Sequence, residues 1–307
     1  MSTQGFKIAA FYRFTPLEDI PALRARIYAF GESVPGLCGT ILLAPEGING
    51  TIGAHPDALD LIVSFLDQHT GIIQGEVKYS TASNKPFNRF KVRPKKEIIT
   101  MRAPEADPTQ HVGTYVSPQE WNDLINDPDV TVIDTRNIYE TDVGTFHNAI
   151  DPRLNTFGEF PDWVEKNLDP AKNKKIAMFC TGGIRCEKAS SYMMAHGFDE
   201  VYHLKGGILK YLEDVPADTS LWQGECFIFD QRVAVTHGLQ EGRYTTCYGC
   251  RAALTEEDTY HAAYEKGVSC AQCIEKLTPE RAQALRSRHQ HIVRKRGSGK
   301  QAAQKHA

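Results

Sequence analysis

The chain has 307 residues, a length that accommodates two or three domains of ordinary size. With 41% hydrophobic and 24% charged residues, a net charge of −3 and no apolar run near the roughly 20 residues that cross a bilayer, the composition excludes a membrane-spanning protein. Because the N-terminus lacks the apolar core of a secretory signal, we expect a cytoplasmic protein whose eight cysteines serve catalysis or metal binding rather than disulfides.

The first segment, residues 1–101, shows strand and helix patterns in the order βαββαβ. The strands are predicted at 7–14, 39–44, 49–53 and 76–81, and the amphipathic helices at 21–30 and 57–68. Asp19 is the expected N-cap of the first helix, and Gly31 is its expected end. This order is that of a ferredoxin-like, or acylphosphatase-like, domain. None of its residues has a catalytic setting, so we expect a scaffold or an RNA-docking module.

A basic stretch, residues 85–96, follows these elements, and in it cations alternate with aromatic or apolar residues. The cations proposed to bind RNA are Arg89, Lys91, Arg93, Lys95 and Lys96. In such a pattern, cations contact phosphates while rings stack on unpaired bases, which is the usual arrangement for single-stranded RNA. A solvated strand face with two core phenylalanines explains the segment equally well.

The second segment, residues 112–218, follows a linker at 102–111 that contains Pro104 and Pro108. Near-continuous apolar runs at 130–134 and 176–179 predict strands that are buried on both faces of a parallel sheet. A helix is expected at 187–196, ending at Gly197, and another strand at 201–204. Strands that alternate with helices predict an α/β layer fold.

The most informative stretch of this segment lies between its second strand and the following helix. It reads Cys180, Thr181, Gly182, Gly183, Ile184, Arg185. A strand–loop–helix turn aims backbone N–H groups and the positive end of the helix at one point. We therefore expect Cys180, facing those groups and Arg185, to be a nucleophilic thiolate with a pKa below the free value of about 8.5. Cys-dependent phosphatases place five residues between Cys and Arg, and the tighter ring here argues against a phosphatase.

Two further motifs flank this loop in the sequence. Residues 134–140 resemble the Asp-x-Arg-x-x-x-Glu signature of rhodanese domains, and residues 204–208 resemble their Gly-Gly-Ile signature. The three motifs in this order identify residues 112–218 as a rhodanese-like domain. Asp134 and Arg136 are expected to support the loop, either as an internal ion pair or in direct contact with substrate. Cys186 is expected to be a packed helix cysteine, with a disulfide to Cys180 as the alternative.

The third segment, residues 219–290, carries two Cys-x-x-Cys pairs separated by 19 residues. The four cysteines are Cys247, Cys250, Cys270 and Cys273. Four thiolates at this spacing predict a structural zinc site, which leaves no open coordination position and stabilises a small Cys-rich domain. Redox-active thiols and an iron–sulfur cluster are the alternatives. From Arg281 to the end there are eight Lys or Arg and no Asp or Glu, and residues 291–307 are predicted to be a basic, disordered tail.

Over roughly residues 5–290, the chain resembles the bacterial tRNA uridine hydroxylases. The matching pieces are residues 44–51 (Ala-Pro-Glu-Gly-Ile-Asn-Gly-Thr), 179–188, 226–230 and the four paired cysteines. The resemblance implies oxygen-dependent hydroxylation of the wobble uridine at carbon 5, with the tRNA anticodon region as partner, dioxygen as co-substrate and Cys180 as the active cysteine. The sequence shows neither a His/carboxylate iron triad nor a dinucleotide fingerprint, so it identifies no redox cofactor.

Our mechanistic hypothesis is that the Cys180 thiolate adds to carbon 6 of the uracil and makes carbon 5 nucleophilic towards an oxygen species. The main alternative is a rhodanese-type sulfurtransferase that carries a persulfide on Cys180 and delivers sulfur to a protein or a tRNA. A binding module with an inactive rhodanese domain is the other alternative, which the intact loop disfavours. The sequence does not predict the oligomeric state.

Overall fold

The computed structural model describes residues 5–304, and the side chains of residues 5–294. Two compact units make up the chain, Met1–Glu241 and Gly242–Ala307. We predicted a domain boundary at residue 219, but residues 219–241 belong to the first unit because their apolar side chains fill its core. Among the described residues, no helix is both long enough and apolar enough to cross a membrane.

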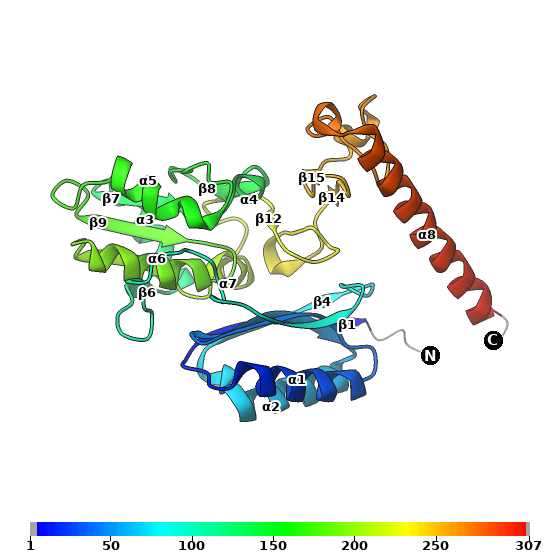
Figure 1. Ribbon diagram of the computed structural model, residues 1–307. Coiled ribbons are helices and arrows are strands. Elements are labelled where there is room, and N and C mark those ends of the chain that lie inside the picture. Colours follow the sequence, from blue (N-terminus) through cyan, green and yellow to red (C-terminus); the bar gives the residue numbers. More distant parts are fainter. Residues whose placement is uncertain (1–4, 305–307) are drawn as a thin grey trace. The chain divides into compact units, whose positions relative to one another are not determined.

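The first unit begins with a five-stranded sheet whose order is β4-β1-β3-β2-β5. Its strands are β1 (Phe6–Phe14), β2 (Cys38–Ala44), β3 (Gly47–Ala54), β4 (Glu76–Ala82) and β5 (Phe90–Pro94). Two helices, α1 (Ile20–Ser33) and α2 (Pro56–Thr70), cover one face of this sheet (Figure 1). The first four strands have the predicted ferredoxin-like arrangement, and β5 adds a parallel strand beside β2.

Alternation along the strands decides which side chains face the two helices. In β1, Ala9 and Phe11 lie in the core with the helices, so Tyr12 lies on the opposite, helix-free face.

Asp19 caps α1 as predicted, accepting a hydrogen bond of 3.2 Å from the amide of Ala22. The predicted end of α1 at Gly31 is wrong, since the helix continues to Ser33. Gly31 has a packing role instead, because a Cβ there would lie 2.2 Å from the Phe90 ring.

The rhodanese-like part contains a parallel four-stranded sheet in the order β6-β10-β9-β7. These strands are β6 (Thr114–Val116), β7 (Val130–Asp134), β9 (Lys175–Phe179) and β10 (Glu200–Leu204). The helices around it are α3 (Pro118–Asn126), α4 (Ile138–Thr141), α5 (Phe160–Asn167), α6 (Ile184–Ala195) and α7 (Gly207–Asp214). One core contains side chains of α5 and α6 and the other contains side chains of α3 and α7. The sheet is therefore buried on both faces, as the apolar runs predicted.

Short strands attach residues 219–241 to the rhodanese-like part. Strand β11 (Trp222–Gly224) pairs with β8 (Gly144–Phe146), and β12 (Cys226–Phe227) pairs with β13 (Ala234–Val235). Trp222 and Cys226 are both buried in the core that contains α3 and α7. This pairing and burial explain why the compact unit extends past residue 218.

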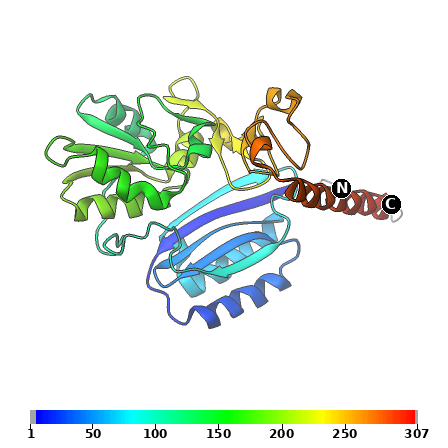
Figure 2. The ribbon, with the colours of Figure 1, turned by 45° about the horizontal axis from the view of Figure 1, so that its top comes forward.

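Residues 95–113 join the two sheets (Figure 2), and several of their side chains are buried. We predicted a linker at 102–111, but Ala103 and Ala106 are buried in the core that contains α5 and α6. Lys188, on α6, is only 2% exposed, and its Nζ lies 2.8 Å from a Glu46 oxygen and 2.7 Å from a Glu97 oxygen. Since Glu46 belongs to the turn between β2 and β3, this partly buried ion-pair cluster fixes α6 against the five-stranded sheet.

The second unit contains the hairpin of β14 (Thr245–Thr246) and β15 (Ala253–Leu254), followed by α8 (Pro279–Gln304). We predicted a disordered tail from residue 291, but the backbone stays helical to Gln304. The Lys, Arg, Gln and Ala residues of this stretch are good helix formers, and the two glycines at 297 and 299 cost about 1 kcal/mol each, which does not end the helix. Residues 305–307 of the predicted tail lie outside the described residues.

Candidate active site

The predicted reactive loop joins the end of β9 to the start of α6. Cys180 is fully buried, and its Sγ accepts a hydrogen bond of 3.1 Å from the amide of Gly183. Gly183 precedes α6 with a φ of +105°, a conformation that favours glycine. The amide of Cys186 is a second backbone donor to the same sulfur. Within the loop, Gly182 and Ile184 are half-buried and the other residues are buried.

The surroundings of Cys180 stabilise its thiolate. Burial raises the pKa of the Cys180 thiol, but the hydrogen bond from the Cys186 thiol, the charge of Arg185 and the two backbone amides outweigh burial and lower the pKa to about 5. The pKa of Cys186 moves the opposite way, because its thiol is buried and hydrogen-bonded to the Cys180 thiolate. Near neutral pH, Cys180 is therefore the thiolate and Cys186 is the proton-bearing donor.

We expect the substitution Cys186→Ala to raise the pKa of Cys180 above about 5, because it removes the largest of the interactions that stabilise the thiolate. The pKa of Cys180 is lower in the folded protein than in the unfolded chain. The thiolate therefore stabilises the folded protein fully above the ordinary thiol pKa, and this contribution is lost as the pH falls through about 5.

The ultraviolet absorbance of the thiolate, titrated against a Cys180→Ser reference, measures the midpoint of the Cys180 titration. Cys38→Ala, which removes a buried thiol of β2, is the control and should leave the midpoint unchanged. An unchanged midpoint in Cys186→Ala would contradict this assignment.

Arg185 lies differently from our prediction, which had its side chain facing the sulfur. Its guanidinium forms a bidentate pair with the buried carboxylate of Glu140, at 2.6 and 2.7 Å. Among the described residues, Arg185 makes no hydrogen bond to Cys180 and acts on it through its charge. Glu140 also accepts a hydrogen bond of 3.0 Å from the Thr181 hydroxyl, so it holds the loop at two points. Although burial raises the pKa of Glu140, the charge and hydrogen bonds of Arg185 lower it overall and keep the carboxylate ionised.

Asp134 and Arg136 form a fully buried ion pair, with 2.6 Å between the two charged groups. Arg136 also donates hydrogen bonds to the carbonyl groups of Glu140 and Gly144, at 3.3 and 2.5 Å. The pair thus fixes the turn that carries Glu140 and does not contact the Cys180 loop. Thr135, between the two, is the residue that reaches the loop region, with its hydroxyl 3.5 Å from the Cys186 sulfur.

The Gly-Gly-Ile motif supports the loop from the other side. The amide of Ile208 donates to the carbonyl of Cys180 at 2.9 Å, and the amide of Leu209 donates to that of Thr181 at 3.1 Å. Gly207 has a φ of +65°, and a Cβ there would lie 2.5 Å from the Cys180 carbonyl oxygen. Only glycine allows this close approach of the start of α7 to the loop.

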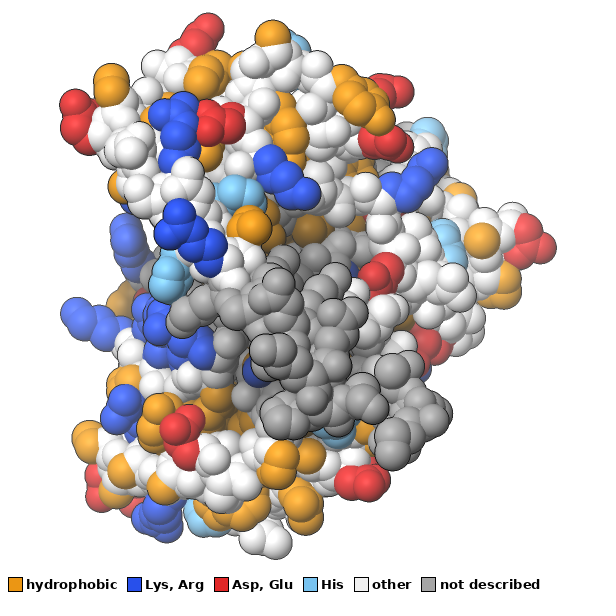
Figure 3. All heavy atoms as spheres, turned by 90° about the vertical axis from the view of Figure 1, so that its right-hand side faces the viewer, with side chains coloured by type: hydrophobic (Ala, Val, Ile, Leu, Met, Phe, Trp, Pro, Cys, Tyr) orange, Lys and Arg blue, Asp and Glu red, His pale blue; other side chains and the backbone are white. Residues whose placement is uncertain are grey.

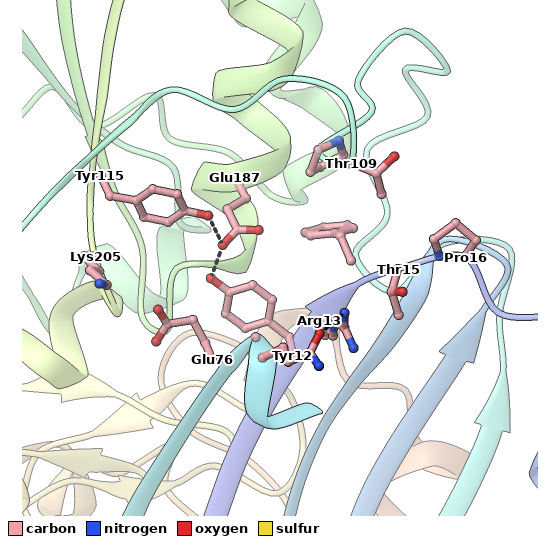
Figure 4. Close-up of a pocket in the computed structure, with 13 residues that line it drawn as sticks. Tyr12, Arg13, Thr15, Pro16, Glu76, Thr109, Tyr115, Glu187 and Lys205 are labelled. Carbon is pink, nitrogen blue, oxygen red and sulfur yellow. Dashed lines mark hydrogen bonds between the residues drawn. The ribbon is translucent and has the colours of Figure 1, made fainter. Parts of the chain in front are cut away.

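Two residues of the five-stranded sheet also contact the loop, although we expected no catalytic setting in residues 1–101. Lys78, on β4, donates a hydrogen bond of 3.0 Å to the carbonyl of Gly182. The Tyr12 hydroxyl, on β1, would lie 2.7 Å from a Cβ at Gly183 and donates to Glu187 at 2.7 Å (Figure 4). No local motif in the sequence marks Tyr12, Lys78 or Glu187 as partners.

The predicted RNA-binding cations lie on and beside β5, the edge strand of the five-stranded sheet. Phe90 and Val92 point into the helix-covered core, so Arg89, Lys91 and Arg93 lie on the helix-free face. Burial and the charges of Arg89 and Arg93 lower the pKa of Lys91, which shows that the three cations lie close together. The exposed cations of the stretch are Arg89, Arg93, Lys95 and Lys96. In the space-filling view, Lys and Arg side chains gather along the left margin, whereas Asp and Glu are scattered (Figure 3).

The four paired cysteines of the second unit come together in one cluster. Their sulfur atoms all lie within 4.8 Å of one another, with separations of 3.8 Å for Cys247–Cys273 and 3.7 Å for Cys250–Cys270. Four sulfur atoms at about 2.3 Å from a tetrahedral zinc lie about 3.8 Å apart, so these separations fit a zinc ion. Gly249 permits the first turn, since a Cβ there would lie 2.2 Å from a backbone oxygen of Val268. The cluster therefore has the geometry of a site for a metal ion.

Comparisons with known proteins agree with this arrangement of domains. Residues 6–98 match the family model described as the UPF0176 acylphosphatase like domain, and residues 117–214 match the rhodanese-like domain. The tRNA uridine(34) hydroxylase of Picosynechococcus sp. is 53% identical, over 94% of this chain and 96% of the relative.

Two further relatives show the same extent of similarity. The tRNA uridine(34) hydroxylase of Rhizobium etli is 52% identical over 96% of each chain. That of Deinococcus radiodurans is 52% identical over 93% of this chain and 94% of the relative. The similarity covers the five-stranded sheet, the Cys180 loop and the cysteine cluster alike, and it is not confined to one shared domain. The chain belongs to the tRNA uridine(34) hydroxylase family.

Proposed function

We propose that this protein hydroxylates carbon 5 of the wobble uridine of tRNA, using dioxygen and the Cys180 thiolate as nucleophile. The observation that carries the proposal is the thiolate itself, whose pKa of about 5 results from two amides, the Cys186 thiol and the charge of Arg185. The relatives, which match 93–96% of this chain, bear the hydroxylase name. A buried thiolate that is ionised near neutral pH is suited to covalent catalysis.

The chemistry runs through a covalent adduct. Addition of the Cys180 thiolate to carbon 6 breaks the 5,6 double bond and places electron density on carbon 5, which then attacks an oxygen species. One oxygen atom of dioxygen enters the base, and the other leaves as water with two electrons from an external donor. Loss of the carbon-5 proton and departure of the thiolate restore the double bond. A thiol with a pKa of about 5 is both ionised at neutral pH and a good leaving group.

The other residues of the site hold this thiolate in place. In the loop of Thr181, Gly182, Gly183 and Ile184, the amide of Gly183 donates to the sulfur, and the amide of Cys186 is the second backbone donor. Arg185 supplies positive charge while bonded to Glu140. The Asp134–Arg136 pair positions Glu140 and does not touch substrate. These contacts keep the charged groups fixed before the substrate binds, so little reorganisation is needed during the reaction.

The anticodon region of tRNA is the proposed partner of the cations on and beside β5. These cations are Arg89, Lys91, Arg93, Lys95 and Lys96. They bind phosphates, which gives affinity that falls as salt is added. In the second unit, Cys247, Cys250, Cys270 and Cys273 would hold a structural zinc ion. With four protein ligands, that ion would stabilise the unit and take no part in the oxygen chemistry.

The test is mass spectrometry of nucleosides from tRNA that was incubated with the purified protein and a reductant, in air and under nitrogen. We expect 5-hydroxyuridine in air and an unchanged nucleoside profile under nitrogen. A mass increase that corresponds to sulfur would instead support the sulfurtransferase, the alternative that the rhodanese-like loop makes chemically reasonable. Unchanged profiles in both atmospheres would contradict the hydroxylase proposal.

A further inference from the structure

A cleft of about 700 Å³ lies beside the Cys180 loop. Its walls come from β1, the start of β4, the segment before β6 and the first turn of α6 (Figure 4). The volume falls in the range of roughly 300–1,000 Å³ that is usual for small-molecule sites, and it accommodates a nucleotide. Aromatic side chains line it together with two cations, Arg13 and Lys205, and two carboxylates, Glu76 and Glu187.

Glu187 presents a hydrogen-bond acceptor to this cleft. One carboxylate oxygen, Oε1, accepts hydrogen bonds from the hydroxyl groups of Tyr12 and Tyr115, at 2.7 and 2.8 Å. The two tyrosines fix the side chain, which is only 8% exposed. The other oxygen, Oε2, has no hydrogen-bond partner among the described residues, and the carboxylate lies at the cleft wall (Figure 4). A fixed carboxylate oxygen with free lone pairs is suited to accept an N–H group of a ligand.

Tyr12 lies between the cleft and the Cys180 loop. Tyr12, which lines the cleft, lies 2.7 Å from the position of a Cβ at Gly183, and the Gly183 amide lies 3.1 Å from the Cys180 sulfur. Burial raises the pKa of Glu187, the hydrogen bonds from Tyr12 and Tyr115 lower it, and the charges of Glu76 and Cys180 raise it, so the pKa is raised overall and the Cys180 thiolate is near enough to contribute. A ligand in this cleft is therefore separated from the reactive loop by the Tyr12 side chain.

The chemistry of the cleft matches a uridine nucleotide. Uracil has an N3–H donor, whereas cytosine has an N3 acceptor at that position, so a carboxylate oxygen accepts a bond from uracil and repels cytosine. The Arg13 guanidinium donates hydrogen bonds to two backbone carbonyls and to the Gln74 side chain. None of these acceptors carries a negative charge. Lys205 is exposed and has no ion pair among the described residues. Arg13 and Lys205, neither of which has an ion pair among the described residues, can bind a phosphate, and the aromatic side chains of the cleft can stack on a base.

We propose that this cleft binds the target uridine nucleotide and that Glu187 selects uracil by accepting its N3–H group. The inference rests on the proposed function. It adds the position at which the uracil base binds and the residue that recognises the base. Because Cys180 is fully buried beneath Gly183 and Tyr12, the base docks in the cleft first and reaches the sulfur when the Tyr12 side chain turns aside. Extrusion of a base into a pocket is the usual way in which enzymes act on a nucleobase.

The test uses the full-length protein and measures binding of uridine 5′-monophosphate and cytidine 5′-monophosphate by NMR titration. Glu187→Gln keeps the shape and the oxygen that accepts from the tyrosines, but it replaces the free acceptor with an NH₂ donor. We expect wild-type protein to prefer the uridine nucleotide, and Glu187→Gln to bind it roughly tenfold or more weakly while gaining relative affinity for the cytidine nucleotide. Glu200→Gln, at an exposed position on β10, is the matched control and should behave as wild type.

A second variant tests the phosphate end of the cleft without disturbing a buried group. Lys205→Gln is expected to weaken binding of uridine 5′-monophosphate but not of uridine, which lacks the phosphate. Equal affinities of wild type and Glu187→Gln for both nucleotides would overturn the inference, as would wild-type protein that hydroxylates tRNA but does not bind the uridine nucleotide. If the base preference follows Glu187 but tRNA gains no oxygen in air, the site stands and the hydroxylase proposal fails.

Discussion

Replacing Cys180 with alanine is expected to lower the rate of tRNA hydroxylation by roughly a thousandfold or more, since it removes the nucleophile on which the adduct depends. The loop itself should persist, because Glu140 still holds Arg185 and Thr181, and α7 still donates to the carbonyl groups of the loop. The measurement is the amount of 5-hydroxyuridine formed per tRNA with time, together with a circular dichroism spectrum to verify the fold.

The matched comparison is Cys186→Ala, which keeps the Cys180 nucleophile but removes the thiol hydrogen bond that stabilises its negative charge. Its activity should fall more at pH 6 than at pH 8, because a raised pKa leaves less thiolate at the lower pH. Hydroxylation that persists in the Cys180→Ala protein would eliminate covalent catalysis by this residue. Incubation with thiosulfate, followed by an assay for cyanide-labile sulfur, tells whether Cys180 carries a persulfide instead.

Removal of the metal ion that the four paired cysteines would hold is expected to unfold the second unit and to leave the first unit folded. That unit has few large buried apolar side chains, and its core clusters are small. Structural zinc in small domains contributes apparent binding free energies on the order of 10 kcal/mol or more, which exceeds what such a core supplies. Metal analysis of the purified protein, followed by limited proteolysis with and without a chelator, measures the effect. Cleavage sites should appear after residue 241 in the chelated protein.

A serine substitution provides the control for this experiment. Cys247→Ser should lower the zinc content and expose the same cleavage sites, whereas Cys38→Ala, at a buried cysteine of the five-stranded sheet, should change neither. A second unit that resists protease after complete removal of metal would contradict a structural role. Iron in place of zinc in the purified protein would support the iron–sulfur alternative.

Much of the fold follows from local patterns that the sequence displays directly. The near-continuous apolar runs at 130–134 and 176–179 form β7 and β9, because strands that are buried on both faces of a parallel sheet are apolar along most of their length. Strand β5 was not predicted, since residues 85–96 stand out for their charge and their pairing with β2 is not a local property. The end of α1 was misplaced for a related reason, because the contact of Gly31 with Phe90 joins residues that are distant in the chain.

The same distinction applies to the site: the parts that depend on local sequence were predicted, and the contacts between residues distant in the chain were not. The loop and its thiolate are visible in the sequence, because a strand, a Gly-containing turn and a helix start define them together. Glu140 is the last residue of the Asp-x-Arg-x-x-x-Glu signature, but the Arg185 to which it is hydrogen-bonded lies 45 residues further along the chain. Tyr12 meets Glu187 across 175 residues, and Lys78 meets Gly182 across 104. A single sequence carries no pattern that pairs such residues, so the contribution of the five-stranded sheet to the loop became visible only in the structure.

The burial of Lys188 has a practical consequence for anyone who expresses this enzyme in pieces. Both of its counter-ions, Glu46 and Glu97, precede residue 112, so a fragment that contains only the rhodanese-like part would leave an ammonium group without the carboxylates that neutralise it. The helix that carries Lys188 begins at the reactive loop, and the same cut would remove Tyr12 and Lys78. An inactive fragment would therefore be no evidence against the chemistry, and an active one would report on a different loop from that of the intact chain.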